Sequence, residues 1–459
     1  MSDRKSDQAY DQRHAFLITL ALGTSSFLTQ FDVTAVVIAM PAIAKDLGFG
    51  VAGFAWIIDA YSLAFTGTLL AAGALADRFG RRWSMLGGNA VFLLASIGCG
   101  IATTGPTLFA ARVLQGAGAA FLATGALALV ATSFPGAGQR ARAFGVMGVI
   151  SGVAMAMGPT LGSFLASWFG WRWIFLANIP FCAALALAVP RLVAETRDPK
   201  GRPLDPVGVV LLTASLGLAI DTLLRHDASL VTTAACLVVS VTGAILFGWR
   251  QWRSPHPLLD PRVFATSAMA GVGALLTAIQ FGYWGMLVYL PLFLNAGLGM
   301  SLEFAGVALL AATLPMLLVP PIGGRLATQH GWRLFFTIAF AVMLLGDASL
   351  AISALSETPS TRLVAAAVGM LGIGVGAALA NPQLSGVAIA LAPPAQAGMA
   401  TAVMMIVRQG GFAISIAVLG AVLGTAGDAA AFARPFTLAA LAALLGIMAA
   451  LTLLPSKST

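Results

Sequence analysis

Charged side chains are scarce in this chain of 459 residues, of which only 9% are Asp, Glu, Lys or Arg. Soluble proteins carry about a quarter of such residues, so the shortage argues against a soluble protein. Histidine occurs four times and cysteine three times. The cysteines have no metal-ligand spacing and stand within apolar stretches, which favours packing over redox chemistry. We therefore expect no bound metal ion and no cofactor.

A nucleotide-binding loop and a basic patch are also missing. The chain contains no GxxxxGK[ST] loop, so the sequence predicts no ATP site. The formal net charge is +8, yet the Lys and Arg residues are spread over many short segments. A nucleic-acid-binding protein would gather them in one patch, so we expect no nucleic acid partner.

Hydrophobic residues, by contrast, make up 59% of the chain, and the mean hydropathy is +0.92. Apolar runs of about 18 residues or more are long enough to cross a lipid bilayer as helices. We therefore predict an all-α integral membrane protein with fourteen transmembrane helices. The expected spans are about 15–39, 54–76, 84–103, 107–131, 143–167, 173–190, 207–224, 229–249, 264–293, 303–322, 334–354, 361–391, 399–424 and 435–454.

A ten-residue segment between the second and third spans returns in the second half of the chain. GALADRFGRR at 73–82 recurs 251 positions later as GRLATQHGWR at 324–333, with five identical positions. This spacing fits a six-helix unit that is repeated after two extra helices. We predict two six-helix bundles related by a pseudo-twofold axis. The expected parts are an N-terminal tail at 1–14, the first bundle at 15–190, a linker at 191–206, two inserted helices at 207–249, a loop at 250–263 and the second bundle at 264–455.

The distribution of positive charge predicts the orientation in the membrane. If the N-terminus is cytoplasmic, 18 of the 25 Lys and Arg residues lie in inner segments and five lie in outer loops. This bias follows the positive-inside rule and places both termini in the cytoplasm. The length and the short loops suit a bacterial inner membrane, which we expect as the location.

Several short motifs stand out in the first half of the chain. A charged loop with two glycines separates the second and third spans, and Asp32 and Asp59 stand inside the first and second spans. The fourth span contains RVLQGAG from Arg112, and the fifth contains GPTLG from Gly158. Together these motifs resemble those of the major facilitator superfamily, specifically its fourteen-helix branch of drug:proton antiporters. The resemblance covers almost the whole chain.

The resemblance implies that the charged loop is a gating element. Its residues are Gly73, Asp77, Arg78, Gly80, Arg81 and Arg82. Ion pairs that form in one conformation favour that conformation, so the loop is expected to act as a latch at the inner end of the first half. The alternative is that these charges only set the topology, although Asp77 is not needed for that purpose. In the second copy Thr328 and Gln329 replace Asp77 and Arg78, which weakens an equivalent latch.

The fifth span holds a glycine-rich motif that the resemblance associates with antiporters. Its residues are Gly148, Gly152, Gly158, Pro159 and Gly162. Proline removes one intrahelical hydrogen bond, and small residues let a neighbouring helix approach closely. We expect a bend that seals the inner or the outer pathway. Simple close packing is the alternative, and the two are compatible.

Acidic residues inside membrane spans indicate a function or a specific partner, because each costs about 2.5–3.5 kcal/mol at the bilayer centre. Asp32, Asp59 and Arg112 have matching depths, and we expect them to form a proton-coupling cluster that faces the central cavity. Loss of water favours the neutral carboxyl group and a nearby guanidinium favours the charged one, so such a cluster can load and release a proton. The alternative is a static buried ion pair. Asp221 and Asp347 are expected near outer helix ends, within reach of headgroups.

Five residues inside the spans are candidates for a substrate cavity: Gln115, Gln280, Trp284, Asn381 and Arg408. Gln115 shares a helix face with Arg112, where it contacts substrate, water or another helix. Gln280 and Trp284 add a polar group and an aromatic wall, or pack between helices. Arg408 and Asn381 have similar depths, and an arginine without a nearby acid suits an anionic or polar substrate group or a set of carbonyl oxygens.

Together with these observations, the resemblance implies a proton-coupled secondary active exporter of small amphipathic compounds such as drugs, biocides or antibiotics. Its expected partners are the substrate, protons and the lipid bilayer, and we expect a monomer that is not an enzyme. Proton-symport uptake of a nutrient is the alternative, and by resemblance Asp59 and the fifth-span motif argue against it. A non-transporting sensor and an intramembrane enzyme are further alternatives. An enzyme needs a convergent set of catalytic groups, but the histidines lie apart in loops or termini at positions 14, 226, 256 and 330.

Overall fold

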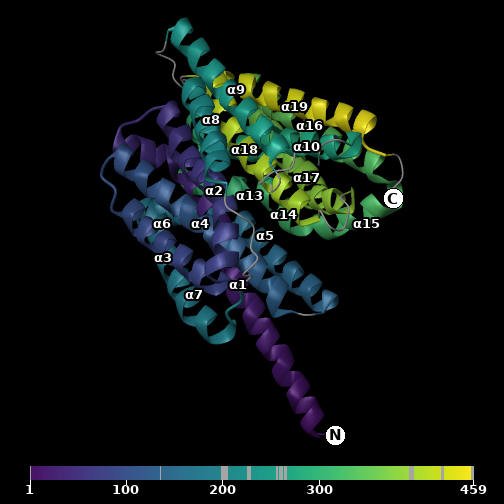
Figure 1. Ribbon diagram of the computed structural model, residues 1–459. Coiled ribbons are helices and arrows are strands. Elements are labelled where there is room, and N and C mark those ends of the chain that lie inside the picture. Colours follow the sequence, from purple (N-terminus) through teal and green to yellow (C-terminus); the bar gives the residue numbers. More distant parts are fainter. Residues whose placement is uncertain are drawn as a thin grey trace.

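The structure is a computed structural model in which long helices lie side by side, with the first half of the chain beside the second (Figure 1). It describes residues 2–134, 136–197, 205–224, 229–254, 257, 262, 266–391, 397–424 and 428–455. Within these residues there are helices and no β-strand, so the predicted all-α fold is confirmed.

The helices of the first half are α1 (Ser2–Leu47), α2 (Val51–Phe79), α3 (Arg81–Gly100), α4 (Gly105–Ser133), α5 (Ala137–Trp168), α6 (Arg172–Leu176) and α7 (Asn178–Leu192). The inserted helices are α8 (Pro206–Leu224) and α9 (Leu230–Arg253). The second half contains α10 (Ser267–Ile279), η2 (Gln280–Gly285), α11 (Met286–Leu292), η3 (Phe293–Gly297), α12 (Leu302–Ala308), α13 (Leu310–Thr313), α14 (Pro315–Leu318), α15 (Pro320–His330), α16 (Trp332–Leu355), α17 (Pro359–Leu391), α18 (Ala397–Leu423), η5 (Ala429–Phe432) and α19 (Ala433–Leu453).

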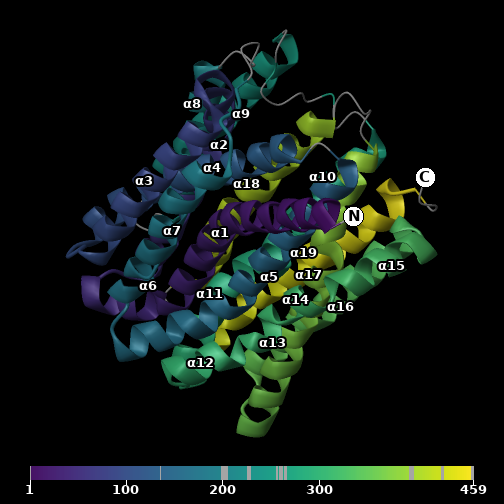
Figure 2. The same cartoon turned by 90° about the horizontal axis from the view of Figure 1, so that it is seen from below.

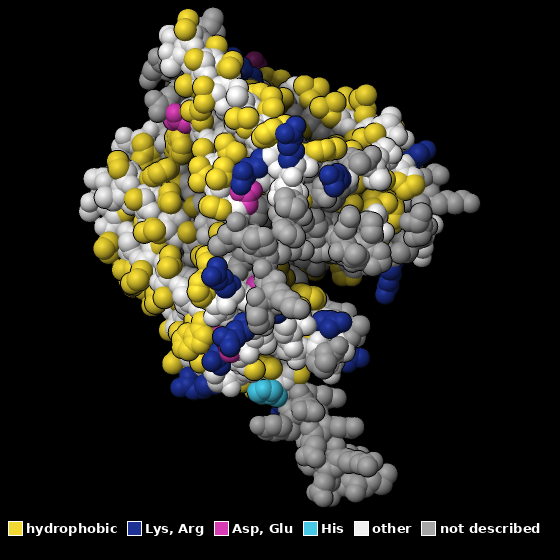
Figure 3. Space-filling view, viewed as in Figure 1, with side chains coloured by type: hydrophobic (Ala, Val, Ile, Leu, Met, Phe, Trp, Pro, Cys, Tyr) yellow, Lys and Arg dark blue, Asp and Glu magenta, His cyan; other side chains and the backbone are white. Residues whose placement is uncertain are grey.

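The number of membrane spans agrees with the sequence. In the described part of the chain, twelve helices are long and apolar enough to cross a membrane. Two further helix pairs, one in α2 and one in α12–α15, pass the same test as spans bent by 45° and 48°. Each pair counted as one span brings the number to 14, as predicted. Hydrophobic side chains cover much of the surface (Figure 3), as expected where lipid replaces water.

The two halves repeat the same helix packing at equivalent glycines. Gly116 of α4 lies so close to α2 that an added Cβ would stand 2.2 Å from the carbonyl oxygen of Tyr61. In the second half, Gly374 of α17 has the same relation to Ala312, at 2.4 Å. Ala312 follows Tyr61 by 251 residues, the interval of the sequence repeat, whereas Gly374 follows Gly116 by 258 residues, so the chain between the two packed helices is seven residues longer in the second half. The close approach of two helix backbones therefore occurs in both halves, as expected for two related bundles.

The inserted helices α8 and α9 pack on each other, and α8 also contacts α2 of the first half and α18 of the second. Asp205 accepts a hydrogen bond of 2.9 Å from the Gly208 N–H at the start of α8, and it pairs at 2.8 Å with Arg250 of α9. Partial burial raises the pKa of Asp205, but these hydrogen bonds outweigh it and hold that pKa below its ordinary value. One carboxylate thus joins the two inserted helices at their loop-side ends.

The two halves are in close contact on the side of the molecule where α1 ends, which we name the far side. The opposite side, where α1 begins, is the N-terminal side (Figure 2). On the far side, Thr160 of α5 donates a hydrogen bond of 3.0 Å to the carbonyl oxygen of Gly306 in α12. An added Cβ at Gly306 would lie 2.0 Å from Ser163 Oγ and 3.2 Å from the Pro159 oxygen. The halves therefore leave no room for a side chain at this point.

Candidate functional site

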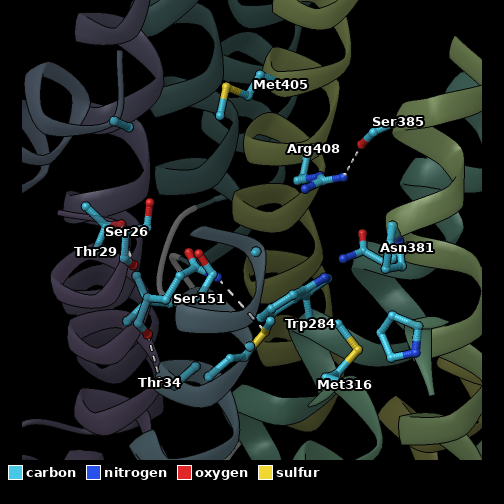
Figure 4. A pocket seen from close by; sticks show the side chains of 18 of the residues that line it. Ser26, Thr29, Thr34, Ser151, Trp284, Met316, Asn381, Ser385, Met405 and Arg408 are labelled. Atoms are coloured by element: carbon cyan, nitrogen blue, oxygen red, sulfur yellow. Dashed lines mark hydrogen bonds between the residues drawn. The ribbon is translucent and has the colours of Figure 1, made fainter. Parts of the chain in front are cut away.

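A cavity of about 560 Å³ lies between the two halves (Figure 4). Its volume suits a drug-sized molecule, since ligand pockets generally have about 300–1,000 Å³. Its wall comes from α1, α2, α4 and α5 of the first half and from η2, α14, α15, α17 and α18 of the second half. In α5, α17 and α18 the wall residues lie in the part of each helix that is nearer to the N-terminal side of the molecule. The cavity is thus separated from the far side by the contact at Gly306.

The first half lines the cavity with neutral residues. One face of α1 does so with the spacing i, i+3, i+4 and i+7, through Ser26, Thr29, Gln30 and Val33. From α5 come Gly148 and Gly152, the first two glycines of the fifth-span motif. Nothing lies within 4 Å of an added Cβ at Gly148, so this glycine widens the cavity.

The second half supplies the charged and aromatic groups. One face of α18 lines the cavity with the same helical spacing, through Met405, Arg408, Gln409 and Phe412. Arg408 Nη2 donates a hydrogen bond of 3.1 Å to Ser385 Oγ of α17, and Asn381 lies one turn earlier on that helix. Trp284 stands in the π-helical segment η2, a rare geometry that is frequent at functional sites. Gln280, Trp284, Asn381 and Arg408 all belong to the cavity wall.

Behind the wall of the first half lies a buried group of polar residues that we name the Asp32 cluster. Arg112 of α4 forms an ion pair with Asp32 of α1, and both side chains are buried. Asp32 also accepts hydrogen bonds from Gln115 at 2.8 Å and from Asn178 at 3.1 Å. Gln115 in turn accepts from Arg112 at 2.7 Å and donates to Ser96 at 2.9 Å. The cluster joins α1, α3, α4 and α7 through a hydrogen-bond network, in which Asn178 Oδ1 is buried without a partner within the described structure.

The Asp32 cluster does not form part of the cavity wall, which corrects the expectation that it faces the cavity. The ring of Tyr61 stands between the two. Tyr61 lines the cavity, and its ring centroid lies 4.4 Å from the guanidinium carbon of Arg112, within cation–π range. Gln115 is likewise fully buried in the cluster and does not line the cavity, because it follows Arg112 on one face of α4.

Asp59 and Asp347 stand apart from this cluster. Both side chains are fully buried, and within the described structure none of their carboxyl oxygens has a hydrogen-bond partner. Asp59 therefore does not join Asp32 and Arg112 as expected. The expectation that Asp347 reaches headgroups is also wrong, because α16 continues for eight residues beyond it and it faces Gly282 of η2. Among the described residues no group of His, Cys, Asp and Glu is placed to hold a metal ion.

The charged loop between α2 and α3 is held by Glu195, an acid that the sequence analysis did not single out. Glu195 follows α7 and accepts hydrogen bonds of 3.0 Å from the backbone N–H groups of Arg82 and Trp83. These groups are free donors at the start of α3, where a negative charge is favourable. Gly80 has a φ of 114°, and an added Cβ there would lie 2.8 Å from the Glu195 carboxyl carbon. The positive φ favours glycine at this turn, and the missing side chain lets the Glu195 carboxylate approach closely.

The other loop residues lie at the surface of the first half. Asp77 and Arg81 form an ion pair of 2.8 Å and are partly exposed. Arg78 is exposed, and Gly73 faces open space. Every hydrogen bond that the loop makes within the described chain stays inside the first half. In this conformation the loop is thus anchored by Glu195 and does not bind the second half through side chains.

The remaining residues of the fifth-span motif pack α5 against its neighbours on the far side. An added Cβ at Gly158 would lie 2.0 Å from Thr34 Oγ1, and one at Gly162 would lie 2.8 Å from the Ala35 oxygen. α5 continues as one helix through Pro159. The motif therefore has two parts, one that faces the cavity and one that lies in the close contact on the far side.

Three residues that shape the site carry little signal in the sequence. Tyr61 and Asn178 stand in apolar segments, and Glu195 is one of several charges in the linker after α7. Their roles depend on contacts between distant parts of the chain, such as the 146 residues between Asp32 and Asn178. A polar residue within a span was the available signal for Asn178, but its position near a helix end favoured an interface with water.

The comparison with known proteins decides the family. A sequence model of the Major Facilitator Superfamily matches residues 22–416. The chain belongs to this superfamily. It is similar to Multidrug resistance protein Stp of Mycobacterium tuberculosis, with 32% identity over 414 residues that cover 90% of this chain and 76% of that protein. Methylenomycin A resistance protein of Streptomyces coelicolor is 33% identical over 412 residues, which cover 89% and 86% of the two chains.

Further likenesses agree with the superfamily assignment. Cephamycin export protein CmcT of Amycolatopsis lactamdurans is 33% identical over 423 residues, covering 88% of this chain and 84% of that protein. The crystal structure of the peptide transporter POT in complex with sulfate has a TM-score of 0.70 at 16% identity, covering 94% and 93%. An inward-facing bacterial homologue of the lysosomal transporter Spinster has a TM-score of 0.64 at 14% identity, covering 97% and 99%. This superfamily member is therefore a multi-pass membrane transporter and not an enzyme.

Proposed function

We propose that this protein is a proton-coupled exporter of small amphipathic compounds such as drugs, biocides or antibiotics. The position of Tyr61 is the observation that carries the proposal. Its ring belongs to the cavity wall and also covers Arg112 of the Asp32 cluster. One aromatic ring thus separates a bound molecule from the ion pair. The resistance and export proteins similar to this chain support export over uptake. The bias of positive charge supports cytoplasmic termini in a bacterial inner membrane, where we propose that the protein acts as a monomer.

Coupling follows from the chemistry of the ion pair. In the structure, the charge of Asp32 is compensated by Arg112 and by two amide donors. A proton that binds to Asp32 removes this charge and weakens the attraction to the guanidinium, which is then free to move toward Tyr61. A molecule in the cavity acts on the same ring from its other face. Proton and substrate therefore favour opposite conformations, as antiport requires.

Alternating access requires the contact on the far side to open. The contact at Gly306 consists of this glycine, the Ser163 side chain, the Pro159 oxygen and the hydrogen bond from Thr160, so few polar groups lose a partner when it separates. On the N-terminal side, Asp77 and its partner Arg81 are partly exposed and free to contact the second half when the cavity closes there. We infer that the charged loop acts as a latch in that second conformation, with Glu195 fixing the loop.

The driving force is sufficient for export without ATP. One proton that moves down a force of about 180 mV releases about 4 kcal/mol, since 100 mV corresponds to about 2.3 kcal/mol per charge. Each 1.4 kcal/mol changes a concentration ratio about tenfold, so this energy supports about a thousandfold gradient of a neutral compound.

Reconstituted protein tests the proposal. We expect substrate and protons to cross proteoliposome membranes in opposite directions under an imposed pH gradient, and a host without its own exporters to become less susceptible to some compounds when it carries the gene. Asp32→Asn is the control that should remove the coupled proton movement. Movement in the same direction would show uptake by symport. No proton movement and no change of susceptibility across a broad panel would contradict transport of this kind.

A further inference from the structure

Arg408 is the only charged side chain among the 28 described residues that line the cavity. The wall contains neither aspartate nor glutamate in the part of the chain that the structure describes, and Arg408 makes no ion pair there. A charged residue inside a membrane protein is costly, and it usually faces a water-filled cavity or a partner of opposite charge. The cavity therefore has a positive charge that nothing in its own wall compensates.

Hydrogen-bond donors without acceptors lie beside this charge. The indole Nε1 of Trp284 is buried without a partner, although such a group donates when an acceptor is in reach. Asn381 Oδ1 is also buried without a partner within the described structure, but this oxygen is an acceptor, so only the Nδ2 group of that amide can donate to a ligand. Arg408 uses one of its nitrogens on Ser385, which leaves the others available. Figure 4 shows Arg408, Trp284 and Asn381 gathered on one side of the cavity, from α18, η2 and α17.

We propose that the cavity binds amphipathic organic anions, with a carboxylate held by Arg408, Trp284 and Asn381. A carboxylate accepts two parallel hydrogen bonds from a guanidinium, and such charge-assisted bonds are stronger than neutral ones. It would also supply the acceptor that the Trp284 indole lacks. An organic cation at this place would meet Arg408 at short range without a compensating acid. The proposal rests on the proposed export function for the role of the cavity as a substrate site.

The apolar part of such a molecule has matching walls around the carboxylate site. Tyr61 and Phe65 of α2 lie on the side of the first half, and Phe412, Met316 and Met405 line the second half. Aromatic rings and thioethers make adaptable contacts with flat apolar groups. The hydroxyl groups of α1, seen at Ser26, Thr29 and Thr34 in Figure 4, are neutral. The net charge of the cavity wall therefore comes from Arg408.

A matched set of three probes tests the sign of the site. Naphthaleneacetate, naphthaleneacetamide and naphthylethylammonium share the naphthalene ring system and differ in charge. Their binding to the purified full-length protein can be measured by calorimetry at pH 7 without a proton gradient. We expect the acid to bind about 10- to 100-fold more tightly than the amide, the range of charge-assisted hydrogen bonds, and the ammonium to bind most weakly. Equal binding of the three, or no binding of any, overturns the proposal.

Variants test the residues. Arg408→Gln should abolish the preference for the acid, whereas Arg434→Gln is the matched control, because Arg434 is exposed at the start of α19 and does not line the cavity. Trp284→Phe keeps the ring and removes only the N–H, so it should weaken binding of the acid about fivefold and leave the ammonium unchanged. It provides the test if Arg408→Gln does not fold. An unchanged preference in either variant contradicts the assigned residue.

Binding and transport fail independently in these experiments. If the acid binds preferentially but a pH gradient drives no export of any compound, the anion site stands and the proposed function fails. If export is found but the wild-type protein binds the three probes alike, the function stands and the anion site is wrong. The probes therefore separate the two proposals, because binding is measured without any gradient.

Discussion

The two halves of the molecule share a frame of helix packing but differ in polar content. Arg112 of α4 lies one turn before Gly116, which packs on α2. One turn before the equivalent Gly374 of α17 stands Met370, a buried apolar residue. Glycines set the distance between backbones, so the frame persists while the neighbouring side chains change. The first half thus has a buried cation where the second half has none.

The acids of the two halves differ in the same way. Asp32 corresponds to Tyr283 and Ser96 corresponds to Asp347, each pair being 251 residues apart. Asp32 has a cation and two amide donors, whereas Asp347 has no hydrogen-bond partner within the described structure. The same arrangement of packed helices therefore holds a compensated acid, Asp32, in the first half and an uncompensated acid, Asp347, in the second half. The uncompensated cation, Arg408, lies in the cavity wall of the second half.

Asp32→Asn should have the largest effect, because it removes the carboxylate that pairs with Arg112 and that we propose binds the coupled proton. We expect substrate-dependent proton movement in proteoliposomes to fall at least about 100-fold. The variant also leaves Arg112 buried without its ion-pair partner, and breaking a buried pair in this way costs about 3–5 kcal/mol. Normal coupling in this variant would remove Asp32 from the mechanism.

The double variant Asp32→Asn with Arg112→Gln separates coupling from stability. It removes both charges, so thermal unfolding should return toward the wild-type temperature, since no buried charge is left unpaired. Coupled transport should stay absent. Recovery of both properties would show a static ion pair, which is the alternative that the sequence left open.

Gly306→Val tests the contact by which the halves meet. The rate of transport should fall about tenfold in this variant. The new side chain has no room beside Ser163, so it should push the halves apart on the far side and favour the conformation that is open there. Labelling of single cysteines placed on the far side measures this shift. Gly87→Val is the matched control, because nothing lies within 4 Å of an added Cβ at Gly87. Equal labelling of the two variants would contradict the role of the contact.

Glu195→Ala should lower the free energy of unfolding by about 1–2 kcal/mol, because the first N–H groups of α3 lose their acceptor. Hydrogen exchange of Arg82 and Trp83 should become faster, which mass spectrometry of that peptide can measure. The turn before α16 should be unaffected, since Arg333 there binds the Leu454 oxygen at 2.8 Å without an acid. Unchanged exchange at α3 would show that Glu195 does not hold the loop.

Asp347→Asn should have the smallest effect and gives the sharpest contrast with Asp32→Asn. The carboxyl group has no cation beside it and does not line the cavity, so coupled transport should stay within about threefold of the wild type. The unfolding temperature should not fall, because an amide is less costly to bury than an uncompensated charge. A loss of coupling as large as that of Asp32→Asn would show that the second half carries a proton site of its own.

Most of the fold was accessible from the sequence, and part of the site was not. Apolar runs, the charge bias and the repeat at 73–82 predicted fourteen spans, and the helices and bent pairs agree. The depths of Asp32 and Arg112 indicated a pair, and the structure brings them together. The direction in which a side chain points from its helix was harder to predict, because each step of one residue turns this direction by about 100°. Gln115 therefore lies in the Asp32 cluster, and the depth of Asp59 did not reveal its isolation.

The sequence by itself determined that the chain spans the membrane repeatedly, because long apolar runs leave a helix as the way to satisfy the backbone in lipid. It also determined the internal repeat and the identity of the costly polar residues. Only the tertiary structure decided the other contacts: Tyr61 with Arg112, Glu195 with the start of α3, and Arg408 with the open cavity. Such pairings depend on how distant helices pack and rotate against one another, and that arrangement is set by close contacts such as those of Gly116 and Gly374.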